Sequence, residues 1–299
     1  MEGVLESPTR MEGVLENLGP HKSSLEELVI QSYVGFTFPP WMFSVQSVLS
    51  NIIHLILFRC PNLKVLPALG KLQFLERLHL LDLIAVKQLG ADILRVGNDA
   101  SMSSLSSSVV LFPKLRLLEL KGLPEWEEEE HDVPTSNNTN IMPHLNTLTI
   151  SNCPKLKVVP HYLFPPQLES LKLWKDVGVI SISLMSITHN SNLKSLEILD
   201  FPHSSLPQGL NQLTSLQELF FGECQFLDYK PDELKPLTML RNLQIGICPI
   251  MSERSREGRS ILTHIPNIVI KADTCSFKRS LKVSKSGIRR GTRRLQDPW

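Results

Sequence analysis

The chain has 299 residues, of which 42% are hydrophobic, and its formal net charge is +1. No hydrophobic run approaches the ~18 residues that a membrane-spanning helix needs, and no secretory signal opens the sequence. From these features we expect a soluble, cytoplasmic protein with a long buried core.

Residues 1–24 form a lead-in that contains a local duplication, because Met1–Glu6 recurs as Met11–Glu16. Residues 14–18 resemble the outer segment that closes a structural repeat. No polar capping unit precedes the first predicted strand, so we expect apolar surface to be exposed at this end. We interpret the chain as a fragment of something longer.

One pattern repeats from residue 25 to residue 270. Its clearest copy, residues 145–156, reads L-x-x-L-x-I-x-x-C-x-x-L, which is the signature of a leucine-rich repeat. Copies begin at Leu25, Ile52, Leu75, Leu115, Leu145, Leu168, Leu193, Leu216, Leu240 and Ile265. Each copy predicts a short strand that must bury its apolar side against its neighbours. We therefore predict an α/β solenoid, a horseshoe with a concave parallel β-sheet and an irregular or short-helical convex side.

Four cysteines share one position of the repeat, eight residues after its start: Cys60, Cys153, Cys224 and Cys248. This position prefers Asn or Cys. Strands about 4.8 Å apart place Cys60, Cys153 and Cys224 too far from one another for a disulfide or a shared zinc ion. We predict buried free thiols, also for the neighbours Cys224 and Cys248, and a reducing compartment. Cys275 lies outside the pattern.

Two insertions, near residues 92–110 and 124–142, lengthen the repeat. The first is rich in serine from 97 to 108 and predicts a mobile loop, with a phosphorylation switch as the less favoured alternative. The second carries an acidic run at 125–132, which we expect to stay in solvent. A divalent-cation cage is disfavoured there because no turning glycine interrupts the run, whereas an interaction patch for a basic partner is retained.

Motifs along the chain resemble one family. The element Gly35–Met42 reads G-x-x-F-P-x-W-M, and C-P-N-L at 60–63, L-P-A-L-G-K-L at 66–72 and F-P-K-L at 112–115 follow in order. Over about residues 14–270 the chain resembles the leucine-rich-repeat region of plant nucleotide-binding leucine-rich-repeat (NB-LRR) disease resistance proteins of the coiled-coil class. The phosphate-binding motif G-x-x-x-x-G-K-[ST] of that family's ATPase does not occur, so nucleotide binding is not carried over.

The resemblance implies a non-catalytic recognition arm of an intracellular immune receptor. In that family this arm senses a pathogen effector, or a host protein that the receptor guards, and holds the ATPase inactive. The expected partners are therefore proteins, including an NB-ARC-type domain in cis or in trans, with no cofactor and no small-molecule substrate. The alternatives are a substrate-receptor adaptor of a ubiquitin ligase, for which an N-terminal helical adaptor is missing, and a non-functional receptor remnant.

Contact residues should lie on the open face of the sheet, where exposed aromatic and charged side chains mark interface positions. We predict that the protein-binding residues are Phe58, Arg77, His79, Lys172, Trp174, Glu197 and Phe220. His54 and His79 fall on adjacent strands, but two imidazoles without a positioned nucleophile or further ligands predict neither an enzyme nor a metal site.

The segment 271–299 is basic, with eight Lys/Arg against one Asp from residue 276 onward, a net charge of +7. We favour a disordered extension. A nuclear-import signal and a contact with nucleic acid or an anionic membrane are the alternatives. A clasp onto the acidic residues 127–130 is a further hypothesis.

Overall fold

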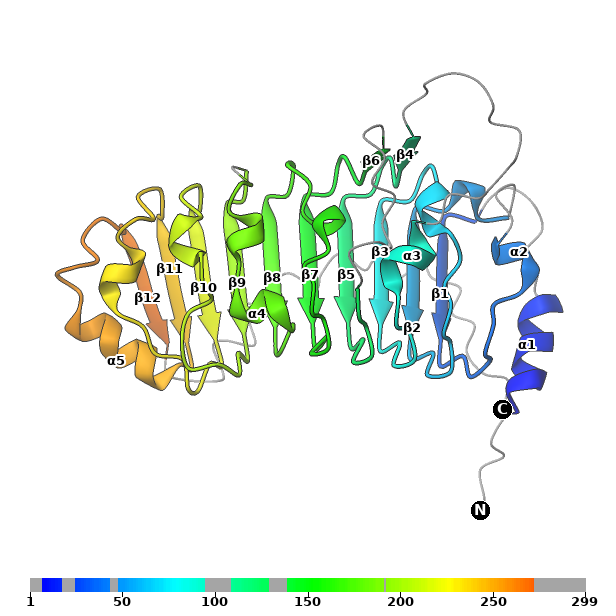
Figure 1. The fold of residues 1–299 in the computed structure, drawn as a ribbon, viewed down its shortest axis with the longest axis horizontal. Coiled ribbons are helices and arrows are strands. Elements are labelled where there is room, and N and C mark those ends of the chain that lie inside the picture. Colours follow the sequence, from blue (N-terminus) through cyan, green and yellow to red (C-terminus); the bar gives the residue numbers. More distant parts are fainter. Residues whose placement is uncertain are drawn as a thin grey trace, which may run out of the picture.

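A single stack of parallel strands organises the computed structural model, which describes residues 7–17, 25–43, 48–94, 109–128, 139–190 and 192–271. Ten strands form one sheet in chain order, with each strand paired in register to the next (Figure 1). The strands are β1 (Glu27–Gln31), β2 (His54–Phe58), β3 (Arg77–Leu81), β5 (Leu117–Lys121), β7 (Thr147–Ser151), β8 (Ser170–Trp174), β9 (Ser195–Leu199), β10 (Glu218–Gly222), β11 (Asn242–Gly246) and β12 (Asn267–Lys271). The leucine-rich-repeat solenoid predicted from the sequence is confirmed.

Short helical segments return the chain from one strand to the next (Figure 1). The α-helices are α1 (Pro8–Asn17), α2 (Pro40–Phe43), α3 (Leu89–Ile93), α4 (Val179–Ile182) and α5 (Pro249–Glu257). Single 3₁₀ turns serve elsewhere: η1 (Val48–Asn51), η2 (Leu69–Lys71), η3 (His161–Leu163), η4 (Met185–Ile187), η5 (Leu210–Gln212) and η6 (Pro231–Leu234). Such short turns fit the small number of residues between successive strands.

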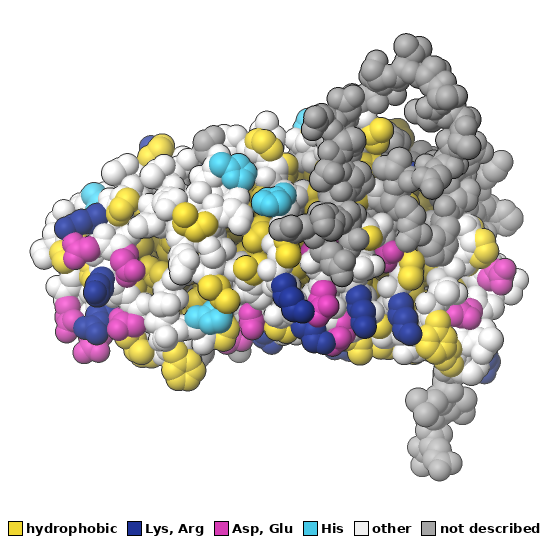
Figure 2. Space-filling model, viewed as in Figure 1, with side chains coloured by type: hydrophobic (Ala, Val, Ile, Leu, Met, Phe, Trp, Pro, Cys, Tyr) yellow, Lys and Arg dark blue, Asp and Glu magenta, His cyan; other side chains and the backbone are white. Residues whose placement is uncertain are grey.

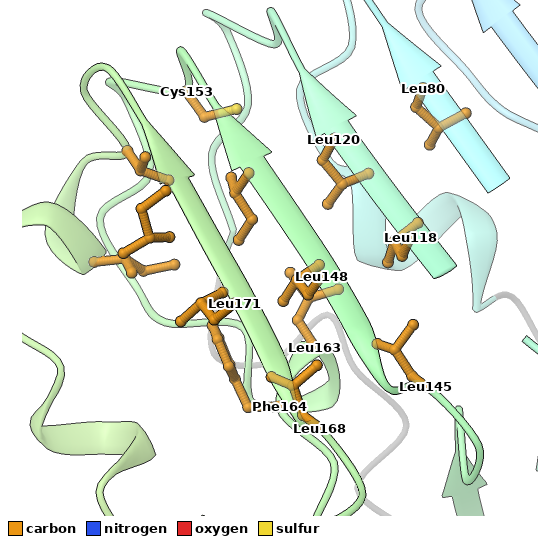
Figure 3. Close-up of a cluster of buried hydrophobic side chains, with 14 of the residues drawn as sticks. Leu80, Leu118, Leu120, Leu145, Leu148, Cys153, Leu163, Phe164, Leu168 and Leu171 are labelled. Carbon is orange, nitrogen blue, oxygen red and sulfur yellow. The ribbon is translucent and has the colours of Figure 1, made fainter. Parts of the chain in front are cut away.

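The core is a continuous ribbon behind the sheet. Leu148 and Ile150, the inward residues of β7, are fully buried. Leu163 and Phe164, from the segment that returns after β7, pack beneath them together with leucines from neighbouring strands (Figure 3). Burying a side chain of this size contributes about 1.5–3 kcal/mol, so the stacked repeats supply the stability that no single repeat could.

Each strand of the main sheet from β1 to β11 is followed at once by a residue with positive φ: Ser32, Arg59, Asp82, Gly122, Asn152, Lys175, Asp200, Glu223 and Ile247. The N–H of each of these residues donates to the carbonyl of the last residue in the next strand, as Asn152 N does to Trp174 O at 3.1 Å. The residue in the left-handed conformation ends the strand, and its N–H adds one more hydrogen bond to the ladder between the two strands.

The cysteine position behaves as predicted. Cys60, Cys153, Cys224 and Cys248 are free and buried. Each thiol lies within hydrogen-bond reach of the carbonyl two residues earlier, for example Cys153 Sγ at 3.4 Å from Ser151 O. Burial raises the pKa of Cys60 to about 11 and that of Cys153 to about 12, which makes both thiols unreactive. Cys275 lies outside the described residues.

Two further strands, β4 (Val109–Leu111) and β6 (Thr139–Ile141), pair in parallel beside the main sheet (Figure 1). The sequence patterns did not predict them. The serine-rich segment 97–108 lies outside the described residues, as do residues 129–132 of the acidic run.

The expectation that the acidic run stays in solvent is wrong for Glu128, whereas Glu125 and Glu127 are exposed in part. Trp126 and Glu128 are buried. Glu128 Oε1 accepts hydrogen bonds from Gly90 N at 2.8 Å, Trp126 Nε1 at 3.2 Å and Tyr162 OH at 2.6 Å. These donors compensate the cost of burying the carboxylate, so it joins three segments of the convex side.

Ion pairs connect neighbouring repeats at the surface. Lys155 Nζ lies 2.7 Å from Glu125 Oε2, and Lys194 Nζ lies 2.7 Å from Glu169 Oε1. Figure 2 shows that positive and negative side chains are interleaved along this face of the solenoid. Such exposed pairs contribute little stability, about 0–1 kcal/mol each.

The N-terminal end of the stack is covered more than the sequence suggested. Helix α1 lies beside α2 (Figure 1), and its Leu15 is buried in the same core. Glu12 Oε1 accepts from Phe36 N at 2.8 Å, and Trp41 Nε1 donates to Leu15 O at 3.2 Å. The expected exposed apolar end is therefore partly wrong, because the lead-in supplies a helix that packs on the first repeat.

The basic segment 272–299 and its proposed clasp onto residues 127–130 lie outside the described residues, apart from Glu127 and Glu128 themselves. Within the described part of the chain, no helix is both long and apolar enough to cross a membrane.

Candidate protein-binding face

The outward side chains of the main sheet form three rows, because the strands pair in register. The middle row contains Val29, Ile56, His79, Glu119, Thr149, Lys172, Glu197, Phe220, Gln244 and Val269. These three rows together are the concave face. It contains all seven residues that the sequence predicted as contact residues.

Four adjacent strands each contribute one outward side chain to a group of two glutamates and two histidines: Glu27 on β1, His54 on β2, His79 on β3 and Glu119 on β5. His54 Nδ1 is 3.2 Å from Glu27 Oε1, and His79 Nδ1 contacts Glu119 Oε2. The two imidazole rings lie side by side with their centroids 5.0 Å apart. The sequence placed both histidines on adjacent strands, and the structure brings them into contact.

Within this group, the pKa values of His54 and Glu119 are both lowered. Burial, His79 and Arg77 lower the pKa of His54 below its usual value, although Glu27 opposes the shift. Burial would raise the pKa of Glu119, but hydrogen bonds and charges from His79 and Lys121 outweigh it and hold the pKa at about 2. Glu119 is therefore an ionised acceptor for both neighbours at neutral pH.

Phe58 and Arg77 are the other two predicted contact residues on β2 and β3. Phe58 is half-buried on β2, and the guanidinium of Arg59 lies 4.8 Å from its ring centroid. Arg77 is exposed on β3. An aromatic ring beside a guanidinium group is a combination that interfaces use frequently.

Lys172 and Glu197 form an ion pair between β8 and β9, with Lys172 Nζ 2.9 Å from Glu197 Oε2. Beside them the ammonium of Lys121 lies 4.0 Å from the ring centroid of Trp174, a cation–π contact. Lys121 is on β5 and Trp174 is on β8, so the lysine reaches across β7. Trp174 is thus covered by a side chain of the face itself.

This crossing explains an unexpected result on β7. The sequence pattern placed Thr149 and Ser151 on the open face, yet both are buried. They are small and lie between strands that carry long charged side chains. Leu199, which occupies an outward position at the end of β9, is buried too, with 6% of its surface exposed. Phe220, on β10, is half-buried in the middle row.

Sequence reasoning missed Glu119 and Lys121 as members of the site. Both occupy outward positions of the repeat, but their role depends on contacts with His79 and Trp174 that come from other repeats. An acidic residue in register with a histidine was the available signal for Glu119. The reach of Lys121 across a whole strand has no signal in the repeat pattern.

The concave face is an open surface of paired charges and half-buried aromatic rings. A cavity of about 440 Å³ lies elsewhere, between β12 and α5, where it is lined among others by Gln225, Ile247, Arg256 and Lys271. It contains none of the seven predicted residues. Among the described residues, no three His, Cys, Asp or Glu side chains are grouped so that they could hold a metal ion. The geometry suits contact with a macromolecule over a broad area.

Comparisons with known proteins agree with this architecture. The family described as R13L1/DRL21 LRRs matches residues 5–83. A solved structure, the leucine-rich repeat domain of the type III effector XopL, is similar with a TM-score of 0.57 and 21% sequence identity, over 82% of this chain and 76% of that chain. By fold the chain is a leucine-rich-repeat protein.

Relatives found by sequence similarity narrow the class of leucine-rich-repeat protein. The chain is 28% identical over 240 residues to the putative disease resistance RPP13-like protein 1 of Arabidopsis thaliana, and 31% identical over 237 residues to the putative disease resistance protein RGA1 of Solanum bulbocastanum. These matches cover 79% and 77% of this chain but only 22% and 19% of the two relatives. The chain is thus a leucine-rich-repeat region of the type found in plant NB-LRR disease resistance proteins, and it spans about a fifth of their length.

Proposed function

We propose that the chain is the non-catalytic, protein-recognition arm of a plant intracellular immune receptor. Its concave face contacts a pathogen effector, or a host protein that the effector alters, and a nucleotide-binding domain that it keeps inactive. A ligand that binds better to the released state shifts the receptor toward activation by that difference in affinity. The four free, buried cysteines support a reducing compartment such as the cytoplasm.

The observation that carries this proposal is the composition of the concave face. Its charges are largely compensated within the face, by Glu119 between His79 and Lys121 and by Glu197 beside Lys172. A polyanion such as nucleic acid requires an excess of positive charge along its path, whereas a protein partner fits mixed charges and aromatic rings. Trp174 Nε1 and Glu197 Oε1 are buried and have no hydrogen-bond partner among the described residues, so each can bond a polar group of a partner when the side chains that cover it move.

The comparisons favour the receptor interpretation over the ubiquitin-ligase adaptor. Both sequence relatives are disease resistance proteins, and nothing in the described residues supports an adaptor.

A charge-swap series tests the proposal. The chain is co-expressed in leaves with the nucleotide-binding region of the RGA1 protein of Solanum bulbocastanum. The association of the two proteins and the resulting cell death are measured. We expect Lys172→Glu and Glu197→Lys each to weaken association and to release cell death. The double variant restores the ion pair but presents reversed charges to the partner, so it should remain defective.

The matched control is the Lys194–Glu169 pair, which joins the same two repeats outside the concave rows at 2.7 Å. Lys194→Glu, Glu169→Lys and their combination should leave association and cell death unchanged. Full association by the Lys172→Glu/Glu197→Lys double variant, or equal defects in both series, would contradict the assignment to the concave face.

A further inference from the structure

The histidine pair of the concave face has an arrangement that partner contact alone does not explain. Across four neighbouring strands the order is carboxylate, imidazole, imidazole, carboxylate: Glu27, His54, His79 and Glu119. Both carboxylates bind the Nδ1 atom of their histidine from the outer side of the pair. A carboxylate accepts hydrogen bonds, so the Nδ1 atoms carry the protons.

This pattern orients the other nitrogen of each ring. Nδ1 and Nε2 are separated by one ring carbon and point in divergent directions, so each Nε2 points away from the carboxylate that holds Nδ1 and toward the side on which the other ring lies. In a neutral imidazole whose Nδ1 is protonated, Nε2 keeps a lone pair. A carboxylate that holds Nδ1 is also the outer partner that metal-binding histidines commonly have.

The spacing of the rings suits a shared ion. Two imidazoles that bind one tetrahedral Zn²⁺ through nitrogens at about 2.1 Å have centroids about 5 Å apart. The observed separation is 5.0 Å, with the ring planes tilted by 56°. Direct stacking of two imidazoles needs neither the tilt nor the two outer carboxylates.

His54 Nε2 supplies a second, independent observation. It is buried and has no hydrogen-bond partner among the described residues, although buried polar atoms usually have one. The two side chains keep 14% and 18% of their surface exposed, so the rings border the open side of the sheet, and an ion reaches the buried Nε2 of His54 when the rings shift apart.

We propose that His54 and His79 bind one divalent transition-metal ion of the zinc class through their Nε2 atoms. The protein supplies two ligands, and water, or a side chain of a bound protein, completes the coordination. Glu27 and Glu119 are positioning residues that hold the rings. The positive charge of Arg77, in register with His54, opposes cation binding and keeps the affinity moderate.

The test uses the full chain and the metal alone, so its result does not depend on the proposed receptor function. Chelator-treated protein is titrated with Zn²⁺ by calorimetry and with Co²⁺ by absorption spectroscopy. We expect one site per chain that is lost in His54→Gln and in His79→Gln, weakened about tenfold in Glu119→Gln, and strengthened in Arg77→Ala. The Co²⁺ spectrum should lack the intense sulfur-to-metal charge-transfer bands that thiolate ligands produce.

Two controls keep the outcome decisive. His161→Gln changes an exposed histidine on η3, away from the concave face, and should bind as the parent chain does. Circular dichroism and thermal unfolding show whether the variants at residues 54 and 79 are folded. Binding that persists in the folded double variant His54→Gln/His79→Gln, or that disappears equally in His161→Gln, would overturn the proposal, as would an absence of binding by the parent chain.

Discussion

The residues that end the strands show how the fold constrains single positions. Nine residues, one after each strand of the main sheet from β1 to β11, occupy the left-handed region so that each N–H can reach the next strand. Only Gly122 is a glycine, and Asn152 is the kind of residue that tolerates this conformation best after glycine. Ile247 is β-branched and has φ of 59°, which is strained for such a side chain.

We expect Ile247→Asn to stabilise the protein by up to about 1 kcal/mol, because asparagine adopts positive φ with less steric conflict. The reciprocal change Asn152→Ile, at φ of 53°, should destabilise it by about 1–2 kcal/mol. Urea unfolding measures both. A loss of stability in Ile247→Asn together with a gain in Asn152→Ile would show that the left-handed conformation is not the source of strain.

Gly178 is required for a different reason. Its φ is 56° and its ψ is −132°, and a Cβ atom there would overlap the carbonyl oxygen of Leu156. Gly178→Ala should therefore cost about 2 kcal/mol or more in the free energy of unfolding. The control is Gly13→Ala in α1, where an added Cβ meets nothing within 4 Å. This control should be neutral or slightly stabilising, since alanine favours a helix; equal losses in both variants would contradict the steric explanation.

At the scale of elements, the repeat pattern predicted the main sheet well. The alternation of Leu148 and Ile150 with Thr147, Thr149 and Ser151 defined β7, and equivalent triplets defined the other strands of the stack. Periodicity succeeds here because each strand has one buried face and the same register.

The pattern did not predict elements whose stability comes from contacts outside the repeat. Strands β4 and β6 are three residues long and exist because they pair with each other. The burial of Glu128 depends on Gly90, Trp126 and Tyr162, which come from three places in the chain. A run of glutamates normally indicates solvent, and only the tertiary donors reverse that preference.

Glu128 offers a test of this interpretation. Glu128→Ala removes the acceptor of three buried donors and should lower the free energy of unfolding by about 3 kcal/mol. Glu128→Gln keeps an amide oxygen and should lose less. The neighbouring Glu127→Ala changes only an exposed ion pair with Lys157 and should stay within about 0.5 kcal/mol. A neutral Glu128→Ala would mean that the network does not hold the convex side together.

At the scale of the whole molecule, the core and the concave face should respond independently to mutation. Leu148→Asp places a charge in a fully buried position and should unfold β7 and its neighbours. Trp174→Ala should leave the fold intact and weaken binding, because Trp174 faces outward beneath Lys121. Circular dichroism and amide hydrogen exchange compare the two variants, and an equal loss of secondary structure in both would refute this division of roles.

The sequence located the concave face but not its internal contacts. Phe58, Arg77, His79, Lys172, Trp174, Glu197 and Phe220 were assigned to the open side of the sheet, and the structure places them there. The cation–π contact of Lys121 with Trp174 and the paired imidazoles depend on side-chain directions between repeats. Strand spacing and register alone do not determine these directions.

Photo-crosslinking is the most direct test of the concave face as the recognition surface. A benzophenone amino acid replaces Phe220 in the middle row or, as the control, His161 on η3. Each chain is co-expressed with the nucleotide-binding region of the RGA1 protein of Solanum bulbocastanum. We predict a crosslink to that region from residue 220 and none from residue 161. A crosslink from residue 161 alone would contradict the assignment of recognition to the concave face.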